Sequence, residues 1–174
     1  MKQPVLKSER LRLRNFELQD SSQVQKLAGN INVAKTTLNI PHPYNDGMAE
    51  EWIKSHKVLW ESRAQLIYAI TKLDTKQLVG AVSLVGISGD QAELGYWIGE
   101  PYWNKGYCTE AARALVTFSF SKLGLNTLFA EHLASNPASG KVMKNIGMSY
   151  SMSKTLKNRF NDYVDVEVYE LQNT

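Results

Sequence analysis

The sequence predicts an α/β protein, in which one mixed sheet carries helices on both faces. Two observations lead to this fold class. Three strand-like segments follow one another between residues 66 and 98, separated by short polar turns, which favours antiparallel hairpins. Further along, a helical segment lies between two strand-like ones, and this β-α-β order favours a parallel crossover. The full predicted order is β-α-α-β-β-β-α-β-α-β-β.

Hydrophobic periodicity places the first elements. In residues 9–16, leucines alternate with arginines, which is typical of a half-buried strand. Residues 19–29 follow as a helix, capped by Asp20 or Ser21. A loop with two prolines and an Asn-Asp-Gly turn then precedes a second helix, residues 48–63, whose apolar side chains recur at helical spacing.

The later elements are bounded by glycines and prolines. A third helix begins after Gly106 and ends at Gly124, and a fourth covers residues 137–146. The strand between these two helices is almost continuously apolar, as expected for a strand buried on both faces. Two strands follow in the tail, after residue 148. The four strands predicted before the tail and after the second helix are residues 66–71, 78–87, 92–98 and 127–133.

Composition indicates one ordinary soluble domain spanning residues 1–174. Hydrophobic residues make up 43% of the chain and charged residues 21%, with no repeats or low-complexity linkers. A net charge of +3 without a basic block argues against nucleic-acid binding. The single cysteine, Cys108, favours a reducing compartment, and no apolar run suggests a signal peptide or membrane span. We therefore expect a cytoplasmic protein without membrane contact.

A possible anion site lies at Gly106, where a lone glycine stands between Lys105 and Tyr107 and a helix starts at once. A helix N-terminus presents unpaired backbone N–H groups and the positive end of the helix dipole, and phosphates bind there. Glycine lets the backbone approach such an anion closely. Residues 104–109 are thus expected to cradle a pyrophosphate. The alternative is that Gly106 only turns the chain, and that Lys105 points to water.

Three motifs together decide between these alternatives. AELGYWI (residues 92–98), PYWNKGYCTEAA (101–112) and ASNPASGKVMKNIGM (134–148) strongly resemble the GNAT family of acetyl-CoA-dependent N-acetyltransferases. Within it, the chain is most similar to the branch of ribosomal-protein N-terminal acetyltransferases. The resemblance implies the GNAT fold, a mostly antiparallel sheet with one splayed parallel strand pair. It also implies acetyl-CoA as cosubstrate, an amine as acceptor and no metal ion. A homodimer is a possible assembly for this branch.

The resemblance also implies which residues hold the cosubstrate. The family's pyrophosphate loop matches Trp103, Asn104, Lys105, Gly106, Tyr107 and Cys108, with Thr109 following. Trp103 stands where a glutamine or arginine is usual, and Cys108 where a small residue is usual. Since the thiol of Cys108 is at a helix N-terminus, its pKa is expected to fall, although the expected role is that of a small space-filling residue, with a redox role as the alternative. Backbone groups of Trp97 and Ile98 are expected to bind the pantetheine arm, with Asn136 bonding that arm or supporting the site.

Acetyl transfer by direct attack needs a base for the amine and a hydrogen-bond donor for the carbonyl oxygen. A backbone N–H of residues 96–98 is the expected donor. Glu93 and His132 are the candidate bases, and Glu131 is a weaker one. The alternatives are an exposed strand carboxylate for Glu93 and a packed or hydrogen-bonded imidazole for His132.

The leaving thiolate needs a proton, and here the chain departs from its relatives. Many of them carry a tyrosine seven residues after the asparagine, but this chain has Met143 there. Ser139 matches a serine proposed as donor in this branch, or is an ordinary residue of the first helical turn. Tyr107 and Tyr150 are further candidates without a predicted position. The missing tyrosine keeps open a non-catalytic module or sensor that binds CoA.

Acceptor recognition is expected within residues 30–63, and the acceptor is a protein or peptide α-amino group or a small-molecule amine. An aromatic set in this region would line the acceptor pocket, with the tryptophans being core residues in the alternative interpretation. The set comprises His42, Tyr44, Trp52 and Trp60.

Overall fold

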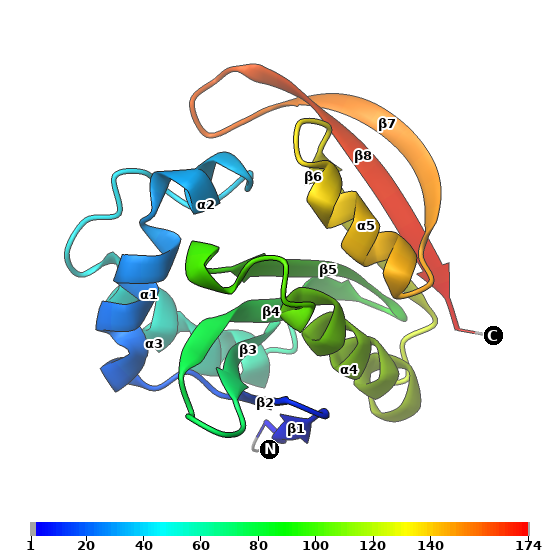
Figure 1. Cartoon of the computed structure of the whole chain (residues 1–174). Coiled ribbons are helices and arrows are strands. Elements are labelled where there is room, and N and C mark those ends of the chain that lie inside the picture. Colours follow the sequence, from blue (N-terminus) through cyan, green and yellow to red (C-terminus); the bar gives the residue numbers. More distant parts are fainter. Residues whose placement is uncertain (1–2, 174) are drawn as a thin grey trace.

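A computed structural model describes residues 3–173 and shows a single eight-stranded sheet with helices on both of its faces (Figure 1). The strands lie in the order β1-β2-β3-β4-β5-β6-β8-β7. Residues 1, 2 and 174, which the single-domain prediction included, lie outside the described residues. The strands are β1 (Leu6–Lys7), β2 (Leu11–Arg14), β3 (Leu66–Lys72), β4 (Leu78–Ser88), β5 (Gln91–Ile98), β6 (Thr127–Leu133), β7 (Ser149–Lys157) and β8 (Tyr163–Gln172).

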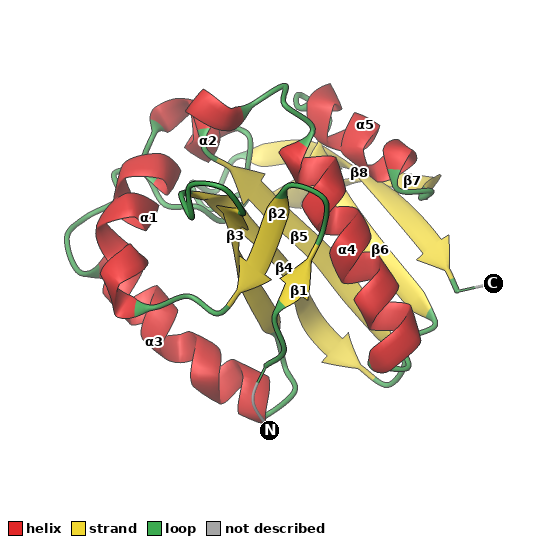
Figure 2. Ribbon diagram, turned by 60° about the horizontal axis from the view of Figure 1, so that its bottom comes forward, coloured by secondary structure: helices red, strands yellow, loops and turns green. Residues whose placement is uncertain are grey.

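The helices cover the two faces of the sheet separately (Figure 2). On one face, α4 contributes Ala111 and Leu115 and α5 contributes Met143 to a core with β3, β4 and β5. On the other face, α1 and α3 pack Val24 and Ile53 into a second, smaller core. The helices are α1 (Ser21–Ala28), α2 (Ile31–Lys35), α3 (Met48–Glu61), α4 (Tyr107–Lys122) and α5 (Pro137–Asn145), with two short 3-10 helices, η1 (Leu18–Asp20) and η2 (Glu100–Tyr102). The predicted fold class is confirmed.

The sequence interpretation missed several short elements, among them α2 and β1. The five-residue helix α2 is capped by Asn30, whose side chain accepts a hydrogen bond from the Asn32 backbone N–H at 2.8 Å. It is too short to show a helical period. The two-residue strand β1 adds an edge to β2 by pairing Leu6 with Leu13.

The parallel pair at the centre of the sheet separates early. All other neighbouring strands are antiparallel, whereas β5 and β6 are parallel and pair only from Gln91 to Glu93 on β5. β5 continues to Ile98 without a further partner on this side among the described residues, while β4 still pairs with it there. The predicted splayed pair is thus present, and it leaves a stretch of backbone free at the sheet's centre.

No helix within residues 3–173 is long and apolar enough to cross a membrane.

Candidate active site

The free edge of β5 directs particular backbone groups into the space beside β6. The Gly99 N–H donates to the Val79 carbonyl at 2.8 Å, on the β4 side of the strand. Because backbone groups of an antiparallel strand alternate in direction, Tyr96 and Ile98 face the β6 side and Trp97 faces β4. This geometry favours Tyr96 and Ile98, rather than Trp97, as backbone partners of a ligand between the strands.

Trp103 is tied to this same edge. Its indole Nε1 donates to the Ile98 carbonyl at 2.7 Å, so the Ile98 N–H remains as the available group of that residue. The tryptophan that replaces the family's usual glutamine or arginine therefore braces the end of β5 against the following loop.

Gly106 has the backbone conformation expected of a close-approach glycine. Its φ is +76°, in the left-handed region that favours glycine, and α4 begins at the next residue. No side chain caps this helix, so the N–H groups of its first turn are left for a ligand. Lys105 turns away, because its Nζ donates to the Pro101 carbonyl at 3.0 Å.

Arg10, which the sequence interpretation did not identify, lies in the turn between β1 and β2 and holds this loop in place. Its Nη1 donates to the Lys105 carbonyl at 3.0 Å, its Nε to Glu110 at 2.7 Å, and its guanidinium lies 4.8 Å from the Tyr107 ring centre. Partial burial opposes the Glu110 charge, but hydrogen bonds from Arg10 and Ser8 lower the pKa of that carboxyl overall. The Gly106 loop is thus held by an ion pair to a distant part of the chain.

The expectation for Cys108 was wrong in direction. The thiol lies in the first turn of α4, where the helix dipole favours a thiolate, yet burial raises its pKa above the ordinary value. Desolvation of a thiolate outweighs the helix end here. Cys108 therefore stays a neutral, space-filling residue.

A cavity of about 940 Å³ joins the loop, the gap and the loop after α2. Every predicted site residue except Lys105 lines it, including Asn104, Thr109 and Asn136. The Asn136 side chain donates to the Thr36 carbonyl at 3.2 Å, linking the start of α5 to the opposite wall. Of the predicted acceptor aromatics, Tyr44 and Trp52 line the cavity, whereas His42 and Trp60 are not among its lining residues.

The side chains of Glu93 and Tyr96 lie on opposite faces of β5. Glu93 lines the cavity just where β5 and β6 part. Desolvation first, and then the nearby charge of Glu131, raise the pKa of Glu93, while Lys154 acts in the opposite direction. Lys154 is itself bonded to Glu131. A carboxylate with a raised pKa in a cavity is a candidate general base.

His132 is hydrogen-bonded through one ring nitrogen and lies close to a carboxylate through the other. Its Nδ1 lies 2.8 Å from the Leu133 carbonyl, and its Nε2 lies 3.2 Å from a Glu167 carboxylate oxygen, outside the angles of a hydrogen bond. The residue is buried, and a Cβ on Gly140 would come within 2.7 Å of Nε2. These contacts favour the packed, structural interpretation of His132.

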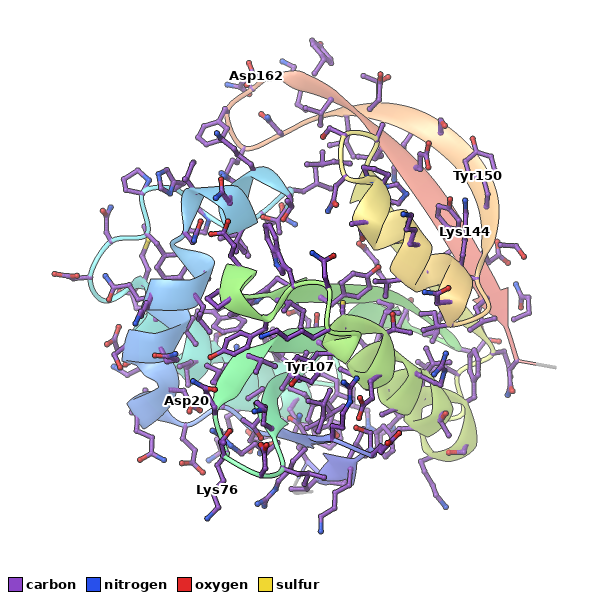
Figure 3. The ribbon with its side chains drawn as sticks, in the orientation of Figure 1. Asp20, Lys76, Tyr107, Lys144, Tyr150 and Asp162 are labelled. Carbon is purple, nitrogen blue, oxygen red and sulfur yellow. The ribbon has the colours of Figure 1, made fainter. Side chains whose placement is uncertain are left out.

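Ser139 meets a side chain that the sequence interpretation did not consider. The Tyr96 hydroxyl lies 3.0 Å from both the carbonyl and the Oγ of Ser139. Met143, at the position of the usual tyrosine, is buried in the core with 1% exposure. Figure 3 shows Tyr107 near the start of α4 and Tyr150 apart from it, beside β7.

Among residues 3–173, no group of three or more histidine, cysteine or carboxylate side chains is placed to hold a metal ion.

Comparison with known proteins gives one consistent result. A family model described as "Acetyltransferase (GNAT) domain" matches residues 10–149. The uncharacterized N-acetyltransferase YoaA of Bacillus subtilis (strain 168) is 26% identical over 146 residues, covering 83% of this chain and 82% of that protein.

Solved structures share the fold. A GNAT-family acetyltransferase from Bacillus anthracis superposes with a TM-score of 0.84 at 24% identity, covering 97% of this chain and 98% of its own. A ribosomal-protein-S5-alanine acetyltransferase from Vibrio fischeri superposes with a TM-score of 0.85 at 15% identity, covering 98% and 97%.

Proposed function

Since this chain belongs to the GNAT acetyltransferase family and is an acetyl-CoA-dependent N-acetyltransferase, we propose that its acceptor is the α-amino group of a protein or peptide. The amine attacks the thioester directly, with both substrates bound at once. Family membership favours this enzyme over the non-catalytic module that the missing tyrosine kept open.

The chain's own groups fit acetyl-CoA. The uncapped first turn of α4 and the left-handed Gly106 supply N–H groups for the pyrophosphate. The unpaired edge of β5 supplies backbone groups of Tyr96 and Ile98 for the pantetheine arm and the acetyl carbonyl. Arg10 holds the loop through the Lys105 carbonyl, and Trp103 holds the end of β5 through the Ile98 carbonyl.

The observation that carries the acceptor assignment is the carboxyl group of Glu93, which lines the cavity at the gap. Glu93 lies there with a raised pKa, whereas both nitrogens of His132 face other groups. An α-amino group has a pKa of about 7.7–8.0, so a carboxylate or a water held by it suffices to deprotonate it. A lysine amine, with a pKa near 10.4, needs a stronger base. The Vibrio fischeri neighbour is likewise named for an alanine acceptor on a ribosomal protein.

A paired-peptide assay tests this proposal. CoA release is measured with acetyl-CoA and a lysine-containing peptide, once with a free α-amino group and once with that group blocked. Spermidine serves as a small polyamine acceptor. We expect turnover only with the free α-amino group. Equal turnover on the blocked peptide, or turnover on spermidine alone, would replace the α-amino acceptor by a side-chain or polyamine amine.

A further inference from the structure

The hydroxyl of Tyr96 occupies a defined place in the cavity. Tyr96 lies on the part of β5 that has already separated from β6, and its side chain crosses to α5. There its oxygen lies 3.0 Å from both the carbonyl and the Oγ of Ser139, in the first turn of α5. Both residues line the cavity.

The first turn of α4 borders the same cavity, because Cys108 lines it together with Tyr96 and Ser139. The Tyr96 oxygen is thus held at the first turn of α5, in the cavity beside the unpaired edge of β5. Glu93 projects to the opposite face of the same strand, because successive strand residues alternate.

The hydroxyl donors that the sequence suggested are less well placed than Tyr96. Met143 fills the position of the usual tyrosine and is buried in the core. Tyr150 is exposed on β7 and bonded to Ser153 at 2.8 Å. Tyr107 lies beneath the Arg10 guanidinium. Ser139 reaches the cavity, but a serine hydroxyl is a much weaker acid than a phenol.

We propose, on the basis of the acetyl-CoA site described above, that Tyr96 donates the proton to the departing CoA thiolate and that Ser139 positions Tyr96. When the amine nitrogen bonds to the acetyl carbon, the carbon–sulphur bond breaks and its electron pair stays on sulphur. The Tyr96 O–H proton moves to that sulphur and leaves a phenolate. The proton lost by the amine departs through Glu93 or its water, and the phenolate is reprotonated from solvent.

Ser139 suits the positioning role. Its carbonyl accepts the Tyr96 O–H in the free protein and so fixes the direction of the phenol. Its Oγ–H can donate to the Tyr96 oxygen and stabilise the phenolate once it forms. Burial raises the pKa of Tyr96, so the phenol keeps its proton at neutral pH until the thiolate arrives.

The test measures the bound thiol itself and needs no acceptor. CoA carrying carbon-13 next to sulphur is bound to the protein, and its chemical shift is followed by NMR as the pH is raised. A hydrogen bond from Tyr96 stabilises the thiolate, so Tyr96→Phe is expected to raise the pKa of the bound thiol by about one to two units. The Tyr150→Phe control removes the same atom from an exposed tyrosine outside the cavity and should leave that pKa unchanged.

The variants separate the two roles. Ser139→Ala is expected to give a smaller rise than Tyr96→Phe, with CoA affinity in calorimetry close to that of the wild type for both. An unchanged thiol pKa in Tyr96→Phe would overturn the proposal, as would a full rise in Ser139→Ala without one in Tyr96→Phe. Failure of the wild-type protein to bind CoA would instead remove the proposed function, and this inference with it.

Discussion

His132 and Glu167 face each other directly across the antiparallel β6–β8 pair, with 3.2 Å between Nε2 and a carboxylate oxygen. A histidine whose Nδ1 faces a carbonyl and whose Nε2 faces a carboxylate on the neighbouring strand is poorly placed to accept a proton from an incoming amine. The base is therefore expected on the neighbouring strand, at Glu93.

Replacing each of the two candidate bases by glutamine distinguishes them. Glu93→Gln is expected to lower kcat by about 10²-fold, the usual contribution of a general base, with little change in the KM for acetyl-CoA. His132→Gln should lower the free energy of unfolding but keep most of kcat. A loss of kcat in folded His132→Gln equal to that in Glu93→Gln would restore the histidine as base.

The pH profile gives an independent test of Glu93. Burial and Glu131 raise the pKa of Glu93, and the carboxylate form is the active one. The rate of the wild-type enzyme should therefore rise with pH through a pKa above the ordinary carboxyl value. This acidic limb should disappear in Glu93→Gln, and its persistence would assign the limb to another group.

The Gly106 loop can be tested against a matched glycine. Gly106 and Gly89 both have left-handed φ values, +76° and +59°, but only Gly106 lines the cavity. Alanine at either position should cost about 1–2 kcal/mol of stability through backbone strain. Only Gly106→Ala should also weaken acetyl-CoA binding in calorimetry. Equal affinity in the two variants would remove Gly106 from the pyrophosphate site.

Arg10 should contribute to affinity without touching the ligand. Arg10→Ala removes the bonds to Lys105 and Glu110, and we expect acetyl-CoA affinity to fall by about tenfold, as for loss of hydrogen bonds between charged groups. Arg12→Ala, on the exposed side of β2, is the control for the lost charge. Equal losses in both variants would indicate a general charge effect.

His56 should make the protein less stable in mild acid. Burial against Phe16 and Trp52 lowers its pKa to about 4, below the ordinary value of 6.5. Between these values the unfolded chain binds a proton that the folded chain does not, so stability falls as the pH drops from 6.5 to 4. We expect His56 to account for about 2 kcal/mol between pH 7 and pH 4.5.

Urea denaturation at both pH values measures this difference. His56→Phe keeps an aromatic ring but has no proton to bind, so its stability should depend less on pH by that amount. The same pH dependence in wild type and variant would show that the pKa of His56 is not lowered in the folded protein.

The fold was largely predictable because its information is local. Alternating leucines in residues 9–16, turn residues between strands and the glycine before α4 each determine structure within a few positions. Contacts between distant residues were not predictable in this way. Tyr96 meets Ser139 across 43 positions, and Arg10 meets Lys105 across 95, and neither pairing leaves a periodic pattern.

Cys108 illustrates a different limit. Its helix-end position, visible in the sequence, favours a lower pKa, but the opposing desolvation depends on packing that only the folded structure supplies. The same holds for His132, whose partners Leu133 and Glu167 decide its role.

The early separation of β5 from β6 has a consequence for how the two halves of the molecule are held together. Within residues 3–173, strands β1–β5 and strands β6, β8 and β7 form two parts of the sheet whose strand pairing is limited to Gln91–Glu93 on β5. A pantetheine arm bonded along the free edge of β5 would act as a short substitute strand between them. Amide exchange in β6 and β8, far from the pyrophosphate loop, should then slow when acetyl-CoA binds. The cosubstrate would in this way stabilise the sheet as well as donate the acetyl group.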